Sequence, residues 1–230
     1  MNRGKFIVID GLDGSGKATQ TKLLIDYLKK QKRQVETVDF PQYYKTFFGH
    51  LVGRYLKGDF GGLNDVSPYL ASLTYAGDRW QAKEKMENAL KKGKILIANR
   101  YTSSSMAFMG AKITKKLKRE KFFQWLTELE FKIYSIPRED FLIYLSVPPK
   151  IGQQLVLNKG ARKYMGNKKK HDIHEANIKY METVEKVYLD LVKRFKNWDK
   201  IECLDEKGNL KTIPAIHREI LKLLKEKNIV

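Results

Sequence analysis

The sequence predicts an α/β fold, with one parallel sheet of five strands covered by helices on both faces. Strand-like and helix-like patterns alternate along the chain, which is typical of such a sheet. A glycine-rich turn joins the first expected strand to the first expected helix. The chain has 230 residues, 42% of them hydrophobic, which is enough for one sizeable core, and no repeat or linker divides it. We therefore expect residues 1–230 to form a single domain.

The expected elements follow one another in a regular order. The first strand is predicted at residues 5–9 and the next helix at residues 16–32, where Leu24 and Leu28 belong to an apolar series at helical spacing. A long helix is expected to begin at Ser67-Pro68, an N-cap followed by proline, and to end at Gly93. The other predicted elements are strands at 34–39, 95–98, 141–145 and about 200–204, and a helix at about 213–225.

The charge of the chain is strongly positive, at +19 with a pI near 9.8. Such an excess is found in proteins that bind nucleic acid. Here the lysines are spread over many expected helices and no nucleic-acid-binding module is recognisable, which favours solvated surface residues. We expect no specific nucleic-acid partner, although the charge keeps that class of protein open.

The apolar run at residues 6–9 ends at Asp10, which makes it shorter than the core of a signal peptide. No stretch is long and apolar enough to span a bilayer, so no membrane partner is expected. The single cysteine, Cys203, excludes an internal disulfide and fits a reducing compartment. These observations predict a cytoplasmic protein.

The turn after the first strand carries the pattern G-x-x-x-x-G-K, which is typical of a P-loop between a strand and a helix. Its glycines bring backbone N–H groups close to a phosphate, and Lys17 adds a positive charge at the outer phosphates. The pattern predicts nucleotide binding, and the expected phosphate-binding residues are Gly11, Leu12, Asp13, Gly14, Ser15, Gly16, Lys17, Ala18 and Thr19.

One position departs from the P-loop pattern. The residue after the lysine is normally a serine or threonine whose hydroxyl binds Mg²⁺, and here it is Ala18. Thr19 carries the nearest hydroxyl, but it lies about 100° further round the helix. Mg²⁺ is still expected as the cofactor that accompanies ATP, but no residue is assigned as a metal ligand.

Several motifs in order along the chain resemble the thymidylate kinase family. They are residues 11–20, Phe40-Pro41, Arg79-Trp80, and Arg100-Tyr101 followed by Ser104, Ala107, Phe108 and Gly110. The resemblance covers nearly the whole chain. It implies a P-loop NTPase fold forming a single kinase domain, a homodimer built on helices beside the acceptor site, and transfer of the ATP γ-phosphate to dTMP, giving dTDP and ADP for dTTP biosynthesis.

The resemblance also implies roles for individual residues. Asp13 matches the carboxylate that contacts the sugar 3′-hydroxyl, Phe40 and Tyr75 match rings around thymine, and Arg79 and Arg100 match arginines that hold the acceptor phosphate. The implied catalytic residues are Lys17, Asp13, Arg100 and Arg162. The implied substrate-binding residues are Asp13, Phe40, Pro41, Leu56, Tyr75, Arg79, Arg100, Ser104 and Phe108.

A polar, lysine-rich stretch at residues 158–171 resembles the mobile lid of the family. Some members carry a catalytic arginine inside the P-loop, and others have glycine there and supply the arginine from the lid. With Gly14 in the loop, this chain resembles the second kind. Arg162 is therefore expected to neutralise charge on the transferring phosphoryl group, with Lys163 or residues 168–170 as alternatives. His171 and His174 are interpreted as surface histidines.

Two further positions differ from the family. Asn99 stands where an acidic residue usually precedes the second arginine, and Gln42 follows the Phe-Pro pair where an arginine is frequent nearby. Together with Ala18, Asn99 keeps open a nucleotide-binding regulatory protein derived from a kinase. Another nucleoside monophosphate kinase of the same fold is the nearest alternative.

Overall fold

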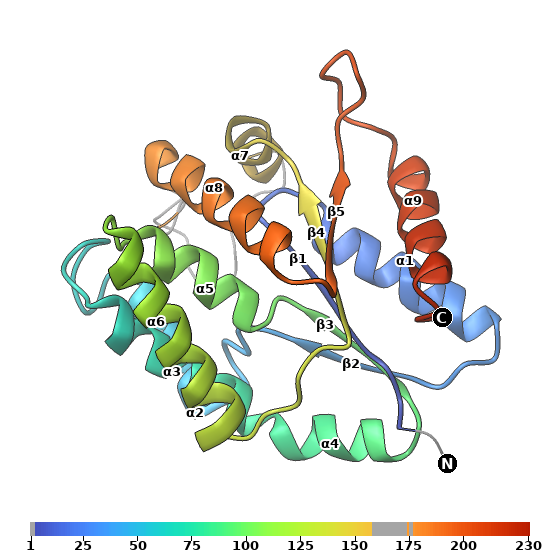
Figure 1. The fold of residues 1–230 in the computed structure, drawn as a ribbon, viewed down its shortest axis with the longest axis horizontal. Coiled ribbons are helices and arrows are strands. Elements are labelled where there is room, and N and C mark those ends of the chain that lie inside the picture. The colour runs from blue at the N-terminus through green and yellow to red at the C-terminus, as the bar shows by residue number, and fades with distance from the viewer. Residues whose placement is uncertain (1–2, 158–173, 175–176) are drawn as a thin grey trace.

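The computed structural model describes residues 3–157, residue 174 and residues 177–230. At its centre lies a sheet of five parallel strands in the order β2-β3-β1-β4-β5 (Figure 1). The strands are β1 (Phe6–Gly11), β2 (Val35–Asp39), β3 (Ile95–Asn99), β4 (Phe141–Ser146) and β5 (Trp198–Glu202). The predicted α/β fold of the P-loop NTPase type, with a five-stranded parallel sheet, is confirmed.

The central strand β1 shows why the sheet is buried on both faces. Successive side chains of a strand point to opposite sides, and in β1 Phe6 and Val8 join one hydrophobic core while Ile7 and Ile9 join the other. Strands covered on both faces are apolar throughout rather than alternating. This is the reason that the short apolar runs of the sequence predict the inner strands correctly.

Two helices cover one face of the sheet. They are α1 (Lys17–Lys30) and α9 (Ile213–Glu226), which lie side by side in Figure 1. Leu24 and Leu28 of α1 pack with Ile220 and Leu224 of α9 in the same core. This packing fixes the position of α1, whose first turn follows the glycine-rich turn at the end of β1.

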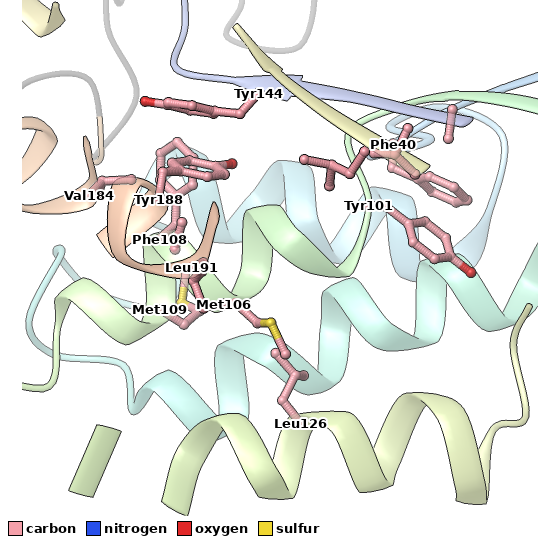
Figure 2. Close-up of a cluster of buried hydrophobic side chains, with 14 of the residues drawn as sticks. Phe40, Tyr101, Met106, Phe108, Met109, Leu126, Tyr144, Val184, Tyr188 and Leu191 are labelled. Atoms are coloured by element: carbon pink, nitrogen blue, oxygen red, sulfur yellow. The ribbon is translucent and has the colours of Figure 1, made fainter. Parts of the chain in front are cut away.

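A larger group of helices covers the opposite face. Aromatic and methionine side chains of this core fill the space between the helices, as Figure 2 shows for Met106, Phe108, Leu126 and Leu191. The helices on this side are α2 (Phe47–Lys57), α3 (Pro68–Gln81), α4 (Lys83–Lys91), α5 (Thr102–Ala111), α6 (Lys116–Glu128), the π-helical turn η1 (Leu129–Ile133) and α8 (Ile178–Arg194). The remaining helix, α7 (Pro149–Leu157), follows β4.

The single long helix predicted between Ser67 and Gly93 is wrong, because the structure has two helices, α3 and α4, in this range. At Ala82 the backbone N–H bonds to Arg79 three residues back, which ends α3 with a tight turn. Ala82 itself is buried, and Met86 and Leu90 of α4 pack into the same core. Tertiary packing therefore places the break at a residue that has a high intrinsic helix propensity.

The excess of positive charge lies largely on exposed lysines at several separate helix ends, as the sequence predicts. Examples are Lys29, Lys30, Lys91, Lys92 and Lys118, all of which are exposed. In the part of the chain that the structure describes, no helix is both long and apolar enough to cross a bilayer.

Candidate active site

The glycine-rich turn lies at the carboxyl end of β1, in the middle of the sheet, and leads into α1. Gly14 and Gly16 have φ angles of 82° and 85°, which glycine adopts without steric cost. At Gly14 space is lacking as well, since a Cβ atom there would lie 2.1 Å from the carbonyl oxygen of Gly152 in α7. The turn thus has the bends of a P-loop, and its backbone packs directly on α7.

Lys17, the first residue of α1, is 7% exposed, and its Nζ donates a hydrogen bond of 2.7 Å to the carbonyl oxygen of Leu12. Its charge is therefore held over the loop. The side chain of Ala18 is exposed at the start of the helix. The Oγ atom of Ser15 is buried and has no hydrogen-bond partner among the described residues, so the loop contains an unused polar atom.

Arg100 connects the P-loop to α5. It follows β3 directly and has a φ angle of 66°, a left-handed conformation that is uncommon for residues other than glycine and is frequent at functional sites. Its Nη2 donates to Asp13 Oδ1 at 2.6 Å, while Nη1 donates to the Gly11 carbonyl oxygen at 3.1 Å and to Ser104 Oγ at 3.2 Å. The guanidinium group is therefore fixed between the loop that binds ATP in P-loop proteins and the neighbouring helix.

The charge of Arg100 is well stabilised. Burial alone disfavours the charged form, but the nearby Asp13 and Asp10 carboxylates outweigh it and raise the pKa of the guanidinium above its ordinary value. The distance from Arg100 Nη1 to Asp10 Oδ1 is 3.6 Å. Arg100 is therefore a permanent cation at the junction of these elements.

Asp10, at the end of β1, is a fully buried carboxylate that the sequence analysis did not assign to the site. It accepts hydrogen bonds from the Gly11 N–H at 2.8 Å, from Ser104 Oγ at 2.9 Å and from the Tyr188 hydroxyl at 3.0 Å, and it also accepts one from Ser103 Oγ. A buried charge is tolerated when it is paired and hydrogen-bonded in this way. The sequence does carry a signal for Asp10, since an acidic residue stands at the end of an otherwise apolar strand, next to a P-loop.

A pocket opens beside Arg100. One part of its lining is charged and polar, through Asp13, Arg100 and Ser104, and the other is apolar and aromatic. The full lining is Asp13, Pro41, Tyr43, Leu56, Tyr75, Arg100, Ser104, Ser105, Phe108, Met109 and His174. Apart from Phe40 and Arg79, every residue predicted from the sequence to bind substrate lies in this lining.

Arg79 does not reach the pocket. Its side chain is 2% exposed, and its Nε and Nη2 atoms donate to both carboxylate oxygens of Glu130, at 2.6 and 2.7 Å. Nη2 also donates to Ser105 Oγ at 2.8 Å. Arg79 is therefore held inside the protein by Glu130 and Ser105 in this structure, and its role at the acceptor phosphate stays a prediction.

Phe40 likewise belongs to the core rather than to the pocket. It is 5% exposed, and its ring centroid lies 5.9 Å from that of Tyr101 (Figure 2). The residue that follows, Pro41, does line the pocket. Phe40 therefore packs in the core, next to a residue of the pocket lining, and does not line the pocket itself.

His174 was predicted to be a surface residue, and this prediction is wrong. The side chain is 4% exposed and lines the pocket. Its ring stacks on Phe108 with the centroids 5.5 Å apart, and its Nε2 lies 3.1 Å from the hydroxyl of Tyr55. Helical spacing in the sequence could not indicate that His174 is buried, since two residues that contact it, Tyr55 and Phe108, belong to the distant helices α2 and α5.

Within residues 3–157, 174 and 177–230, no cluster of three or more His, Cys, Asp or Glu residues has suitable placement to bind a metal. The Oδ1 atom of Asn99, at the end of β3, is buried and without a described partner. The predicted lid at residues 158–171, with Arg162, lies outside the described residues.

Comparison with known proteins bears on this arrangement. The family model for thymidylate kinase matches residues 9–212. The chain belongs to the thymidylate kinase family. Thymidylate kinase from Plasmodium falciparum is 29% identical over 201 residues, which cover 83% of this chain and 89% of that protein. The human thymidylate kinase is 26% identical over 219 residues, covering 95% and 88%.

A solved structure of thymidylate kinase from Candida albicans has the same fold. It matches with a TM-score of 0.75 at 20% identity, covering 99% of this chain and 93% of that one. Gln42 is not among the residues that line the pocket, and its side-chain Nε2 donates instead to the Asp78 carbonyl oxygen at 3.3 Å. The next residue, Tyr43, lines the pocket instead.

Proposed function

We propose that this protein transfers the γ-phosphoryl group of ATP to dTMP, giving dTDP and ADP. The phosphotransferase activity follows from membership of the thymidylate kinase family. The observation that supports dTMP as acceptor is the two-part pocket beside the P-loop. Asp13 and Arg100 suit a sugar hydroxyl and a phosphate, and Leu56, Tyr75 and Phe108 suit a planar base.

The P-loop residues Gly11 to Thr19 would hold the ATP phosphates through backbone N–H groups. In the described part of the chain no side chain caps the N-terminus of α1, so the N–H groups of its first turn are available to an anion. Lys17 would exchange its bond to the Leu12 carbonyl for the outer phosphates. Phosphoryl transfer depends mainly on positioning and charge stabilisation, which these groups supply.

Arg100 would hold the acceptor phosphate. It is the only arginine or lysine among the described residues that line the pocket. Arg79, the other predicted phosphate ligand, is bound to Glu130 instead. We infer that the Tyr43 hydroxyl also binds this phosphate, since Tyr43 lines the same pocket as Arg100. Ser104 and Phe108, on α5, would complete the acceptor site.

Mg²⁺ would reach the site as the complex with ATP. Ala18 offers no hydroxyl, and the oxygens of Asp10 and Asp13 already accept hydrogen bonds within the protein. The residues present therefore fit an ion that keeps phosphate oxygens and water as its main ligands, the usual habit of Mg²⁺. The unpartnered oxygens of Ser15 and Asn99 would accept hydrogen bonds from that water. The ion neutralises charge on the phosphates when bound.

Arg162 is proposed as the lid residue that neutralises the transferring phosphoryl group. The support is the glycine at position 14, where the packing against Gly152 leaves no room for a side chain. The variant Arg162→Ala should lower kcat more than it raises the KM for ATP. An unchanged kcat would assign this role to another residue.

A coupled assay with ATP and Mg²⁺ tests the function. The purified protein is given dTMP, dUMP, dCMP, UMP or AMP, and we expect the highest kcat/KM with dTMP. Lys17→Ala should abolish turnover, while Lys22→Ala, on an exposed position of the same helix, serves as the control. A preference for another monophosphate would replace the proposed acceptor, and ATP binding without any turnover would indicate a regulatory protein.

We also propose that residues 1–230 act as one kinase domain and assemble as a homodimer in the cytoplasm. The support for the dimer is a set of exposed apolar residues on helices beside the acceptor pocket, which are Phe47 on α2, Leu70 and Trp80 on α3, Leu117 on α6 and Ile133 in η1. Sedimentation analysis of the wild type and of Leu70→Asp tests the dimer. The buried thiol of Cys203 fits a reducing compartment, which cell fractionation would examine.

A further inference from the structure

Tyr188 lies in the middle of α8, 178 positions from Asp10 along the chain, yet its hydroxyl reaches the residues behind Arg100. The side chain is completely buried. Its hydroxyl lies 3.0 Å from Asp10 Oδ1 and 3.1 Å from Ser104 Oγ. Asp10 lies outside the pocket lining and Ser104 belongs to it, so the tyrosine acts on the residues that surround the arginine.

The hydrogen bonds of Ser104 connect the Tyr188 hydroxyl to Arg100. A serine hydroxyl has one proton to donate and two lone pairs that accept. Ser104 Oγ donates to Asp10, at 2.9 and 3.0 Å from its two oxygens, and accepts from Arg100 Nη1 at 3.2 Å. The Tyr188 hydroxyl, which also has a single proton, shares it between Asp10 Oδ1 and Ser104 Oγ and so occupies the remaining acceptor position of Ser104. The four groups therefore form a closed network in which every polar atom at the centre has a partner.

The ring of Tyr188 is held as firmly as its hydroxyl. It stacks on Tyr144 of β4, with the centroids 4.7 Å apart and 20° between the planes, and the edge of Phe108 packs against it at 6.3 Å. Figure 2 shows the two tyrosine rings face to face, with their hydroxyl groups pointing to opposite sides. Buried networks of this kind fix one geometry because an unpaired member is costly.

We propose that Tyr188 is a positioning residue for Arg100, holding the guanidinium in place for the acceptor phosphate through Asp10 and Ser104. The need for such support is visible in the backbone, since Arg100 has a left-handed conformation that neighbouring contacts must maintain. The inference rests on the proposed function, in which Arg100 binds dTMP. It assigns a role in acceptor binding to a helix that contributes no described side chain to the pocket lining.

The stacked pair supplies a matched control. The hydroxyl of Tyr144 is buried and has no hydrogen-bond partner among the described residues. Tyr188→Phe and Tyr144→Phe each remove one buried hydroxyl from the same pair of rings and leave the stacking intact. Only the first removes a donor from the Asp10 network, so a difference between the two variants reports the network rather than packing.

The expected result is a selective loss of acceptor binding. Tyr188→Phe should raise the KM for dTMP at least about fivefold, as expected for one hydrogen bond in a charged network, while the KM for ATP changes less than about twofold. Tyr144→Phe should keep both KM values within about twofold of the wild type. Equal KM values for dTMP in the two variants would overturn the inference.

A second measurement distinguishes action through Arg100 from general loosening. In an Arg100→Lys background, Tyr188→Phe should cause little further change in the KM for dTMP, because the group that it positions is already gone. Full additivity would contradict the proposal. If Tyr188→Phe does not fold, Asp10→Asn, at a residue outside the pocket lining, removes the carboxylate that links Tyr188 to Arg100 and should give the same split between the two KM values; an unchanged KM for dTMP would overturn the idea.

Failure of the proposed function gives a different pattern. If the wild type does not phosphorylate dTMP, the acceptor assignment fails first. The Tyr188 inference is then decided by calorimetry, comparing the Kd of each variant for the monophosphate that the wild type does turn over or bind. A Kd that is equal in Tyr188→Phe and Tyr144→Phe counts against it.

Discussion

Arg79 on α3 and Glu130 in η1 form a bidentate ion pair in which both side chains are almost completely buried, with N–O distances of 2.6 and 2.7 Å. Thr102 also donates to Glu130, at 2.8 Å. Burial by itself lowers the pKa of Arg79, but the Glu130 carboxylate raises it above its ordinary value overall. The pair therefore links α3, α5 and η1 behind the acceptor pocket.

This relationship predicts that Glu130→Ala lowers the free energy of unfolding by about 3–5 kcal/mol, since an unpaired buried charge remains. Urea denaturation measures the loss. The double variant Arg79→Met, Glu130→Leu should recover much of the stability, because an apolar pair of similar volume leaves no charge behind. If Arg79→Met, Glu130→Leu folds normally but fails to bind dTMP, Arg79 contacts the acceptor after all.

Restoring a hydroxyl after the P-loop lysine should change the magnesium dependence. Ala18→Thr places an oxygen where P-loop proteins bind the ion, and we expect the Mg²⁺ concentration for half-maximal rate to fall about fivefold, as about 1 kcal/mol of added ligand energy would give. Ala18→Val has the same shape without the oxygen and is the control. Identical magnesium titrations for the two variants would show that the exposed side chain at this position lies away from the ion.

His174 should contribute to acceptor recognition, because it forms a wall of the pocket against Phe108. We expect His174→Ala to raise the KM for dTMP several-fold, about the effect of losing one stacked ring at 0.5–1.5 kcal/mol, while the KM for ATP stays nearly constant. His50→Ala, an exposed histidine on α2, controls for the loss of a histidine as such. A KM for dTMP that is unchanged in His174→Ala would leave the ring with only a packing role.

Cys203 should be unreactive in the folded protein. Its side chain is fully buried, and burial, with a contribution from Glu202, raises the pKa of the thiol to about 12. The reactive thiolate is therefore scarce at pH 8, where the ordinary thiol in the unfolded chain is already partly ionised. Labelling with a chromogenic disulfide should find one thiol in urea and almost none in buffer. Rapid labelling without denaturant would mean that β5 and the loop after it open readily.

The sequence was a good guide to features that depend on neighbouring residues. Short apolar runs predict the inner strands β1, β3 and β4, and the P-loop is predicted by its own spacing because the bend and the anion site are made by consecutive residues. Features that depend on distant residues were missed. Tyr55 and His174 are 119 positions apart, and Arg79 and Glu130 are 51 apart, so no local pattern could show that Arg79 is neutralised or that His174 is buried.

The contact between Gly14 and Gly152 limits how this protein can change during evolution. A Cβ atom at Gly14 would lie 2.1 Å from the Gly152 carbonyl oxygen, and one at Gly152 would lie 2.5 Å from the Asp13 carbonyl oxygen. Neither position can gain a side chain unless α7 and the loop separate. With this contact in place, a single substitution cannot add an arginine at position 14, which fits the proposal that another segment supplies the catalytic cation.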